Sequence, residues 1–146
     1  IVCSASAIKA AEYLKEKFGT PYEIEYPQSC LPEEIVQKAD NFTDKNVLVI
    51  HNQTAADAVR KLITEKSGKC HCTSATFFMQ KKELLQQGDI FLADESDLCD
   101  NVGDNYDVVI ADKTLRRVMK NFSGEFIDFP HFGLSGRLLQ GESEKI

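Results

Sequence analysis

Residues Asn46–Lys66 read NVLVIHNQTAADAVRKLITEK, and this stretch decides the fold class. The run NVLVI is almost continuously apolar, which is typical of a strand that is buried on both faces of a parallel sheet. From Thr54 to Lys66, alanine, valine, leucine and isoleucine recur every three or four residues, as on one face of a helix. The stretch therefore predicts a strand over 46–51 that leads directly into a helix over 54–66.

The same alternation continues toward the C-terminus. Four further segments have the composition of strands: Cys70–Thr76, Asp89–Ala93, Tyr106–Ala111 and Glu125–Phe129. Three segments between or beside them are expected to be helical: Gln80–Gln87, Asp94–Val102 and Thr114–Asn121. Strands that alternate with helices predict a Rossmann-like three-layer α/β/α fold, with a mainly parallel sheet of about five strands.

The first forty residues differ from this pattern. Apolar residues recur with helical spacing from Ala5 to Phe18, and Gly19 is expected to end the helix in the left-handed conformation that glycine adopts most easily. Three further features are expected after it: a short extended segment over 22–26, a second helix after Pro32, and a polar linker over 40–45.

Length and composition exclude several classes of protein. The chain has 146 residues, of which 42% are hydrophobic and 27% charged, as in a soluble globular domain. The net charge is −6 and no basic cluster is present, so neither nucleic acid nor a membrane surface is expected as a partner. The longest apolar runs are far shorter than the ~20 residues that a membrane-spanning helix needs.

Five cysteines are present: Cys3, Cys30, Cys70, Cys72 and Cys99. An odd number in a chain that is long enough to fold without disulfides favours free thiols in a reducing compartment, so we expect a cytoplasmic protein. The chain starts at Ile1-Val2 without a methionine, and this pair looks like the end of a strand. We expect the chain to be a piece of a longer protein.

Ligands of parallel sheets bind outside the carboxyl ends of the strands. The turn after the first strand, His51–Asp57, has no glycine, which excludes a dinucleotide-binding fingerprint, and no Walker-type loop is present. Acidic residues at later strand ends, among them Asp94 and Asp112, are similar to those of a phosphoacceptor receiver domain. A receiver also needs an acidic pair after its first strand, where this chain has His51-Asn52.

Cysteines and histidines carry weaker signals. Cys70 and Cys72 share one face of a strand, but no second pair stands at zinc spacing, so packing is their expected role. His51 and His131 follow strands, and for both a functional role and a packing role stay open. No catalytic residue is assigned.

Two parts of the chain resemble one family. Cys3 is followed by a helix that ends in Glu16–Tyr22 (EKFGTPY), and the C-terminal part contains Phe126–His131 (FIDFPH) and Leu134–Arg137 (LSGR). Both are similar to the nitrogenase component 1 family of oxidoreductases, which includes cofactor-assembly scaffolds and tetrapyrrole reductases. Lys45–Ile50 and the next helix fit between them. The resemblance covers nearly the whole chain and implies the C-terminal portion of a subunit.

This resemblance implies a domain division. Residues 1–40 would be a helix-containing segment of the preceding domain, and residues 45–146 a C-terminal Rossmann-like domain. Family subunits stack three such domains around metal clusters. The implied partners are a paralogous subunit and an ATP-dependent iron protein that delivers electrons.

The resemblance also implies site residues. In the family a cysteine just before this helix binds an iron–sulfur-type cofactor, which makes Cys3 the candidate metal ligand. A helix N-terminus favours a negatively charged thiolate at that position. Six residues are implied to line the cofactor cavity: Asn52, Gln53, Thr54, Ser135, Gly136 and Arg137.

The chain departs from nitrogenase itself. A cofactor-binding histidine follows the Ser-Gly pair in nitrogenase, whereas this chain has Leu138, Leu139 and Gln140 there. We therefore expect a fragment of a nitrogenase-like reductase of unknown substrate, which alone holds no cluster and is inactive. The alternatives are a non-catalytic cofactor-assembly scaffold of the same family and a metal-free α/β ligand-binding or signalling module.

Overall fold

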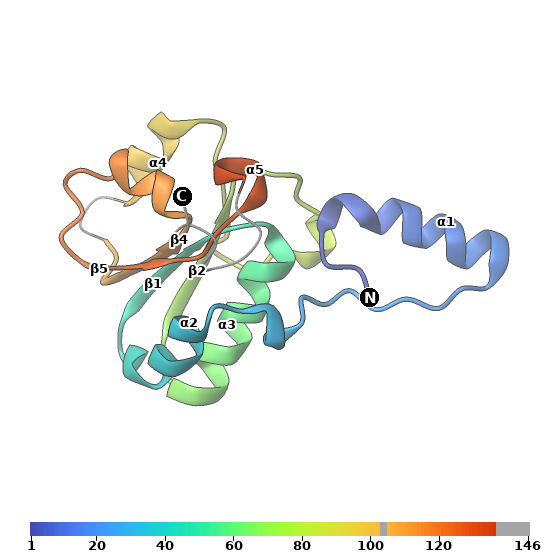
Figure 1. Ribbon diagram of the computed structural model, residues 1–146, viewed down its shortest axis with the longest axis horizontal. Coiled ribbons are helices and arrows are strands. Elements are labelled where there is room, and N and C mark those ends of the chain that lie inside the picture. The colour runs from blue at the N-terminus through green and yellow to red at the C-terminus, as the bar shows by residue number, and fades with distance from the viewer. Residues whose placement is uncertain (103–104, 137–146) are drawn as a thin grey trace.

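The computed structural model describes residues 1–102 and 105–136. Its centre is a five-stranded sheet in the order β3-β2-β1-β4-β5, in which every neighbouring pair is parallel (Figure 1). The strands are β1 Asn46–Ile50, β2 His71–Thr76, β3 Ile90–Phe91, β4 Val108–Ala111 and β5 Glu125–Asp128. The predicted Rossmann-like parallel sheet is thus confirmed.

Successive strand residues point to opposite faces of the sheet, so an apolar strand such as β1 has two apolar faces to bury. Helices cover both of them. On one face, Val47 and Val49 of β1 pack in a core with α2 (Glu33–Lys38) and α3 (Gln53–Ser67). On the other face, Leu48 and Ile50 pack in a second core with α4 (Glu95–Val102) and a 3-10 turn at Lys113–Arg117. Among the described residues, no helix is long and apolar enough to cross a membrane.

The order of the strands sets the position of the site. From β1 the chain moves outward through β2 and β3, then returns to the other side of β1 for β4 and β5. The direction therefore reverses between β1 and β4, and open parallel sheets bind ligands at the carboxyl end of this switch point. The short helix α5 (Phe132–Ser135) follows β5 at the same end of the sheet.

Three segments differ from the expectation. The helix expected at Gln80–Gln87 is only a 3-10 turn at Lys82–Leu84, and the one expected at Thr114–Asn121 is the 3-10 turn at Lys113–Arg117. The polar linker expected over 40–45 begins inside a 3-10 turn, Ala39–Phe42, in which Phe42 is fully buried. The burial of Phe42 in the core holds this segment against the sheet, although most of its residues are polar.

Residues 1–27 form an arm beside the sheet, here called the N-terminal arm. It contains a 3-10 turn at Ala5–Ala7 and helix α1 (Ile8–Phe18), which projects away from the rest of the molecule (Figure 1). Gly19 ends α1 with φ of 69°, as predicted. Val2 and Ile24, on either side of α1, form a parallel β-bridge.

Candidate functional site

The turn after β1 brings part of the predicted site together. The side-chain oxygen of Asn52 caps α3 by accepting a hydrogen bond from the Ala55 N–H at 3.0 Å. The Thr54 hydroxyl lies 2.9 Å from the same oxygen and donates to the backbone carbonyl of Cys3. Cys3 itself has an exposed side chain. Asn52 and Thr54 therefore lie beside the candidate metal ligand.

Gln53 serves a different contact. It is fully buried, and its amide binds the backbone of Lys81, donating to the carbonyl at 3.1 Å and accepting from the N–H at 2.9 Å. This amide therefore anchors the connection that follows β2. The 3-10 turn Lys82–Leu84 begins at this anchor, since the Leu84 N–H donates to the same Lys81 carbonyl at 3.1 Å.

Four aromatic rings contact one another beyond the carboxyl ends of β1, β2 and β5, in two stacked pairs that meet edge to face. His51 stacks on Phe129 with ring centroids 4.0 Å apart, and its ring lies 4.5 Å from that of His131. His131 in turn stacks on Phe78 at 4.0 Å. We call these four residues the aromatic stack. It occupies the place where the fold would otherwise open to a ligand.

The surroundings of both histidines favour the neutral ring. Nε2 of His51 donates to the Pro130 carbonyl at 3.2 Å, while its Nδ1 is buried without a partner among the described residues. Nδ1 of His131 accepts from the Gly133 N–H at 3.0 Å, so this ring also carries its hydrogen on Nε2. Burial, assisted by the neighbouring His131, lowers the pKa of His51 to about 4, and burial lowers the pKa of His131 as well.

Asp112, at the end of β4, holds the turn that follows β5. Its carboxylate accepts from the His131 N–H at 2.8 Å, from the Ser135 hydroxyl, and from both the N–H and the hydroxyl of Thr114. Burial alone would raise its pKa, but these hydrogen bonds outweigh burial and lower the pKa to about 2. The candidate Ser135 thus binds Asp112. Gly136, with φ of 69°, ends α5.

The remaining candidate, Arg137, lies outside the described residues, as do Leu138, Leu139 and Gln140. Candidates from the two halves of the predicted site therefore occupy two places. Asn52 and Thr54 lie beside Cys3 at the N-terminus of α3. Ser135, on α5, lies beside Asp112 at the end of β4.

Tyr26 lies between these two places. Its ring is 6.3 Å from that of His51 and 6.2 Å from that of Phe129. Burial raises the pKa of Tyr26, and the thiols of Cys30 and Cys3 act in the same direction. Sequence reasoning missed Tyr26, which ends the extended segment expected over 22–26. Phe78 follows the second strand, at the carboxyl end where a ligand site is expected, but no role was assigned to it.

The donor set fits only part of a metal centre. Within residues 1–102 and 105–136, no three His, Cys, Asp or Glu residues are grouped to hold a metal ion. A self-contained site for a single ion therefore does not fit these residues. An iron–sulfur-type cluster carries its own sulfides, and one exposed thiol such as that of Cys3 fits as a single ligand to it, with the other ligands coming from elsewhere.

Cys70 and Cys72 fit the packing role that was expected of them. Burial raises the pKa of both thiols, that of Cys72 to about 12, so both are protonated near neutral pH. They pack against the core on the α3 side of the sheet. A protonated, buried thiol is a poor metal ligand.

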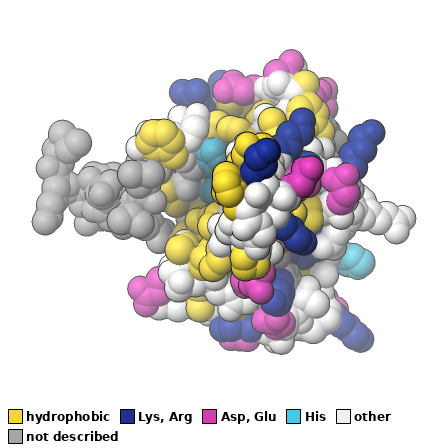
Figure 2. All heavy atoms as spheres, turned by 90° about the vertical axis from the view of Figure 1, so that its right-hand side faces the viewer, with side chains coloured by type: hydrophobic (Ala, Val, Ile, Leu, Met, Phe, Trp, Pro, Cys, Tyr) yellow, Lys and Arg dark blue, Asp and Glu magenta, His cyan; other side chains and the backbone are white. Residues whose placement is uncertain are grey.

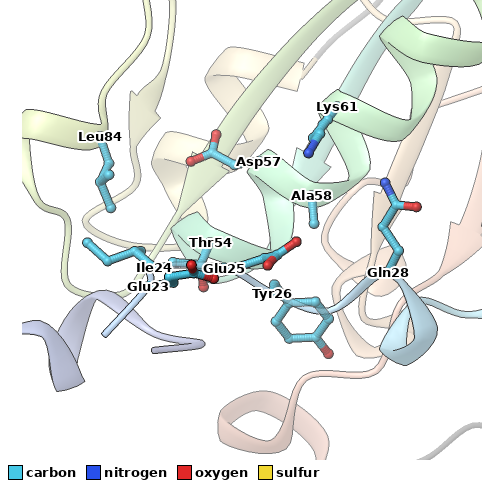
Figure 3. Close-up of a pocket in the computed structure, with 10 residues that line it drawn as sticks. All are labelled: Glu23, Ile24, Glu25, Tyr26, Gln28, Thr54, Asp57, Ala58, Lys61 and Leu84. Atoms are coloured by element: carbon cyan, nitrogen blue, oxygen red, sulfur yellow. The ribbon is translucent and has the colours of Figure 1, made fainter. Parts of the chain in front are cut away.

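A groove of about 410 Å³ lies between the 23–28 segment and α3 (Figure 3). Its lining residues are Glu23, Ile24, Glu25, Tyr26, Gln28, Thr54, Asp57, Ala58, Lys61 and Leu84. Thr54 belongs both to this groove and to the contact with Cys3. The lining carries three carboxylates and one ammonium group.

Comparison with solved structures gives a distant likeness. No protein-family model and no curated protein matches the chain. A solved structure described as nitrogenase Cp1 at pH 6.5 aligns with a TM-score of 0.44 and 16% sequence identity. The alignment covers 88% of this chain and 31% of that chain, so this chain spans less than a third of its length. A likeness at this level does not show membership of the nitrogenase family.

Proposed function

We propose that this chain is part of a subunit that resembles nitrogenase component 1, in which Cys3 supplies one thiolate to an iron–sulfur-type cofactor. One observation carries the proposal: the Thr54 hydroxyl holds the Cys3 backbone at the N-terminus of α3 while the cysteine side chain stays exposed. The sequence resemblance around Cys3 supports the same role.

The N-terminal arm supports a division into two domains. Val2 and Ile24 pair in parallel and are joined by α1, which is the arrangement of a β-α-β unit. Two strands that share a single bridge are too small to be stable alone. We infer that residues 1–40 contribute their arm, residues 1–27, to a second parallel domain, while α2 packs with residues 45–146 in the core of the Rossmann-like domain.

Each residue at the Cys3 seam has a role in this proposal. The thiol of Cys3 binds the cofactor, which supplies electron storage and transfer when bound. Asn52 and Thr54 orient the Cys3 backbone from the N-terminus of α3. Ser135 and Gly136 would line a more distant wall, and the bond from Ser135 to Asp112 holds the start of that wall in place. Arg137 is implied there by the resemblance alone.

The proposed activity is ATP-coupled reduction of a substrate that the chain alone does not identify. An ATP-dependent iron protein would deliver the electrons, and a paralogous subunit would complete the cofactor cavity. The single thiol supports this requirement for other chains, because one ligand does not hold a cluster. Residues 1–146 alone are therefore expected to be inactive.

The test uses the full-length protein purified without oxygen. We expect iron and acid-labile sulfide, and an EPR signal that Cys3→Ser changes or removes. Cys99→Ser is the matched control, because Cys99 is also exposed but lies on α4. Absence of iron would contradict the cluster, and an EPR signal identical in the Cys3 variant and the control would remove Cys3 from the site.

Two alternatives give different results. A cofactor-assembly scaffold would hold the cluster but show no turnover with reduced iron protein and ATP. A metal-free binding module would contain no iron. The groove beside α3 favours this second alternative, because it offers a ligand site without any metal donor set.

A further inference from the structure

The bridge between Val2 and Ile24 leaves one backbone edge open. The Val2 N–H donates to the Glu23 carbonyl at 2.7 Å, and the Glu25 N–H donates to the Val2 carbonyl at 3.1 Å. In a parallel pair the residue between these two partners directs its own N–H and C=O to the opposite side. That residue is Ile24, and neither group bonds to any residue that the structure describes.

The groove beside α3 adjoins this edge. Ile24 is one of its lining residues, and Figure 3 shows the 23–28 segment crossing below α3, with Leu84 at one end. Ile24 and Leu84 give the groove an apolar part, and Ile24 is 37% exposed. An open strand edge beside an apolar groove is a site to which an extended peptide can add as a further strand.

The charges of the groove select the kind of peptide. Glu23, Glu25 and Asp57 face one ammonium group, that of Lys61, among the lining residues. Along an extended segment, residues 23 and 25 lie on one face and residue 24 on the other. A strand that pairs with this segment is therefore best matched when basic and apolar side chains alternate along it.

We propose that this edge and groove bind an extended peptide segment with alternating basic and apolar residues, supplied by a partner protein. The peptide backbone forms hydrogen bonds with the open N–H and C=O of Ile24, and these bonds set the position of the peptide. Its basic side chains pair with Glu23 and Glu25, and its apolar side chain packs on Ile24 and Leu84. The proposal is independent of Cys3 and of any cofactor. It takes Ile24 as an edge strand of the second domain inferred above, with further strands of that domain on the Val2 side.

Asp57 adds a dependence on pH. Burial raises the pKa of Asp57 to about 6; Arg60, 3.5 Å from Oδ1, opposes this effect, and the carboxylate of Asp89 adds to it. Oδ1 is buried without a hydrogen-bond partner among the described residues. A nearby cationic side chain stabilises the ionised carboxylate. Binding of a basic strand is therefore expected to be stronger above pH 6 than below it.

The probe is a fluorescein-labelled pentapeptide, Lys-Val-Lys-Val-Lys, and the control replaces each lysine with glutamate. Fluorescence anisotropy at low ionic strength measures binding to the full-length protein, and amide hydrogen exchange locates it. We expect the basic peptide to bind at least tenfold more tightly than the acidic one. The Ile24 N–H should become protected on binding.

Variants separate charge from backbone pairing. Glu23→Gln with Glu25→Gln should weaken binding at least fivefold, whereas Glu65→Gln, an exposed residue of α3 outside the groove, should leave it unchanged. Ile24→Pro removes the open N–H and spares the two bonds to Val2. It should also weaken binding, provided that the Glu25 N–H keeps its protection from exchange.

Several results would overturn the proposal. They are equal binding of the two peptides, binding without protection of the Ile24 N–H, and no binding of the basic peptide up to about 1 mM. If Ile24→Pro exposes the Glu25 N–H, the arm has unfolded. The double glutamate variant and the protection of Ile24 in the unchanged chain then decide the question.

Discussion

At the scale of single residues, His51 is the buried titratable group with the clearest consequence. Its ring is 4% exposed, stacked on Phe129 and in contact with His131. Nε2 donates to the Pro130 carbonyl. Nδ1 is buried, and no described residue would accept a hydrogen bond from it if it were protonated. Protonation of this ring would therefore place a charge and an unpaired donor in the core.

This arrangement predicts that His51 makes the fold sensitive to acid. The ordinary histidine pKa is 6.5 and that of folded His51 about 4, so between these values the unfolded chain binds a proton that the folded chain does not. The contribution of His51 to the free energy of unfolding is fully present above pH 6.5 and is lost as the pH drops toward 4. From about pH 7.5 to about pH 4.5 we expect a loss of about 2 kcal/mol relative to His51→Phe.

Urea unfolding at both pH values measures this difference. Asp57 acts in the opposite direction, because its raised pKa lets the folded state take up a proton first, but it is present in both proteins and cancels. The exposed His71 provides the control substitution His71→Phe. Parallel pH profiles for the unchanged protein and His51→Phe would contradict the prediction.

Asp112 is predicted to be essential for the start of α5. In Asp112→Asn an amide nitrogen replaces one acceptor oxygen and faces donors such as the His131 N–H and the Ser135 hydroxyl. The new amide N–H then faces groups that also donate and leaves them without an acceptor. We expect the free energy of unfolding to fall by about 3 kcal/mol. Urea unfolding checks this against Asp100→Asn, an exposed residue of α4. A loss as small as that of the control would show that Asp112 is dispensable.

At the scale of elements, local sequence and tertiary contacts disagree in the segment after α2. Residues 40–45 read DNFTDK, which is mostly polar and predicts a linker. In the structure Ala39–Phe42 is a 3-10 turn, and both of these residues are fully buried in the core on the α3 side of the sheet. One aromatic side chain fastens the segment to the sheet.

Phe42→Ala is therefore predicted to be strongly destabilising. Removing a fully buried phenyl ring leaves a cavity and should lower the free energy of unfolding by about 3–5 kcal/mol. Phe132→Ala makes the same chemical change at a side chain that is 65% exposed and should have little effect. Thermal and urea unfolding compare the two. Similar losses would mean that burial does not determine the cost.

At the scale of the whole molecule, two large cores and one small cluster are separate. The sheet has a core on each face, whereas the N-terminal arm buries only Val2, Ala5, Ile8 and Ala11 in a cluster of its own. The C-terminal half of α1 projects from the molecule, and its Leu14 and Phe18 are exposed (Figure 1). Figure 2, which looks onto the side where α1 projects, shows hydrophobic side chains mixed with charged ones on that surface.

The arm is predicted to open independently of the sheet. Since it buries few apolar side chains, amides of α1 should exchange at least about 100-fold faster than amides of α3, which packs on the sheet. Hydrogen exchange in low concentrations of urea measures both helices in one sample. Equal protection that falls together with urea would instead make the arm part of a single cooperative unit.

The sequence by itself determined the class of the fold. Apolar runs such as NVLVI and VVIA, each followed by a helical or turn segment, are sufficient for a parallel sheet because burial on both faces leaves a continuous signal. The left-handed end of α1 at Gly19 was also predictable, since glycine meets that backbone requirement locally. A prediction from local pattern failed where a long-range contact decides, as at Phe42, which is buried in the core on the α3 side of the sheet.

Only the tertiary structure decided which candidates meet. Thr54 reaches Cys3 across 51 positions of sequence, while Gln53, its neighbour, binds Lys81. The aromatic stack at the switch point joins the ends of three strands, and Ser135 binds Asp112. The reason is physical: a pattern along the chain records how each segment is buried, but which side chains face one another depends on strand order and register.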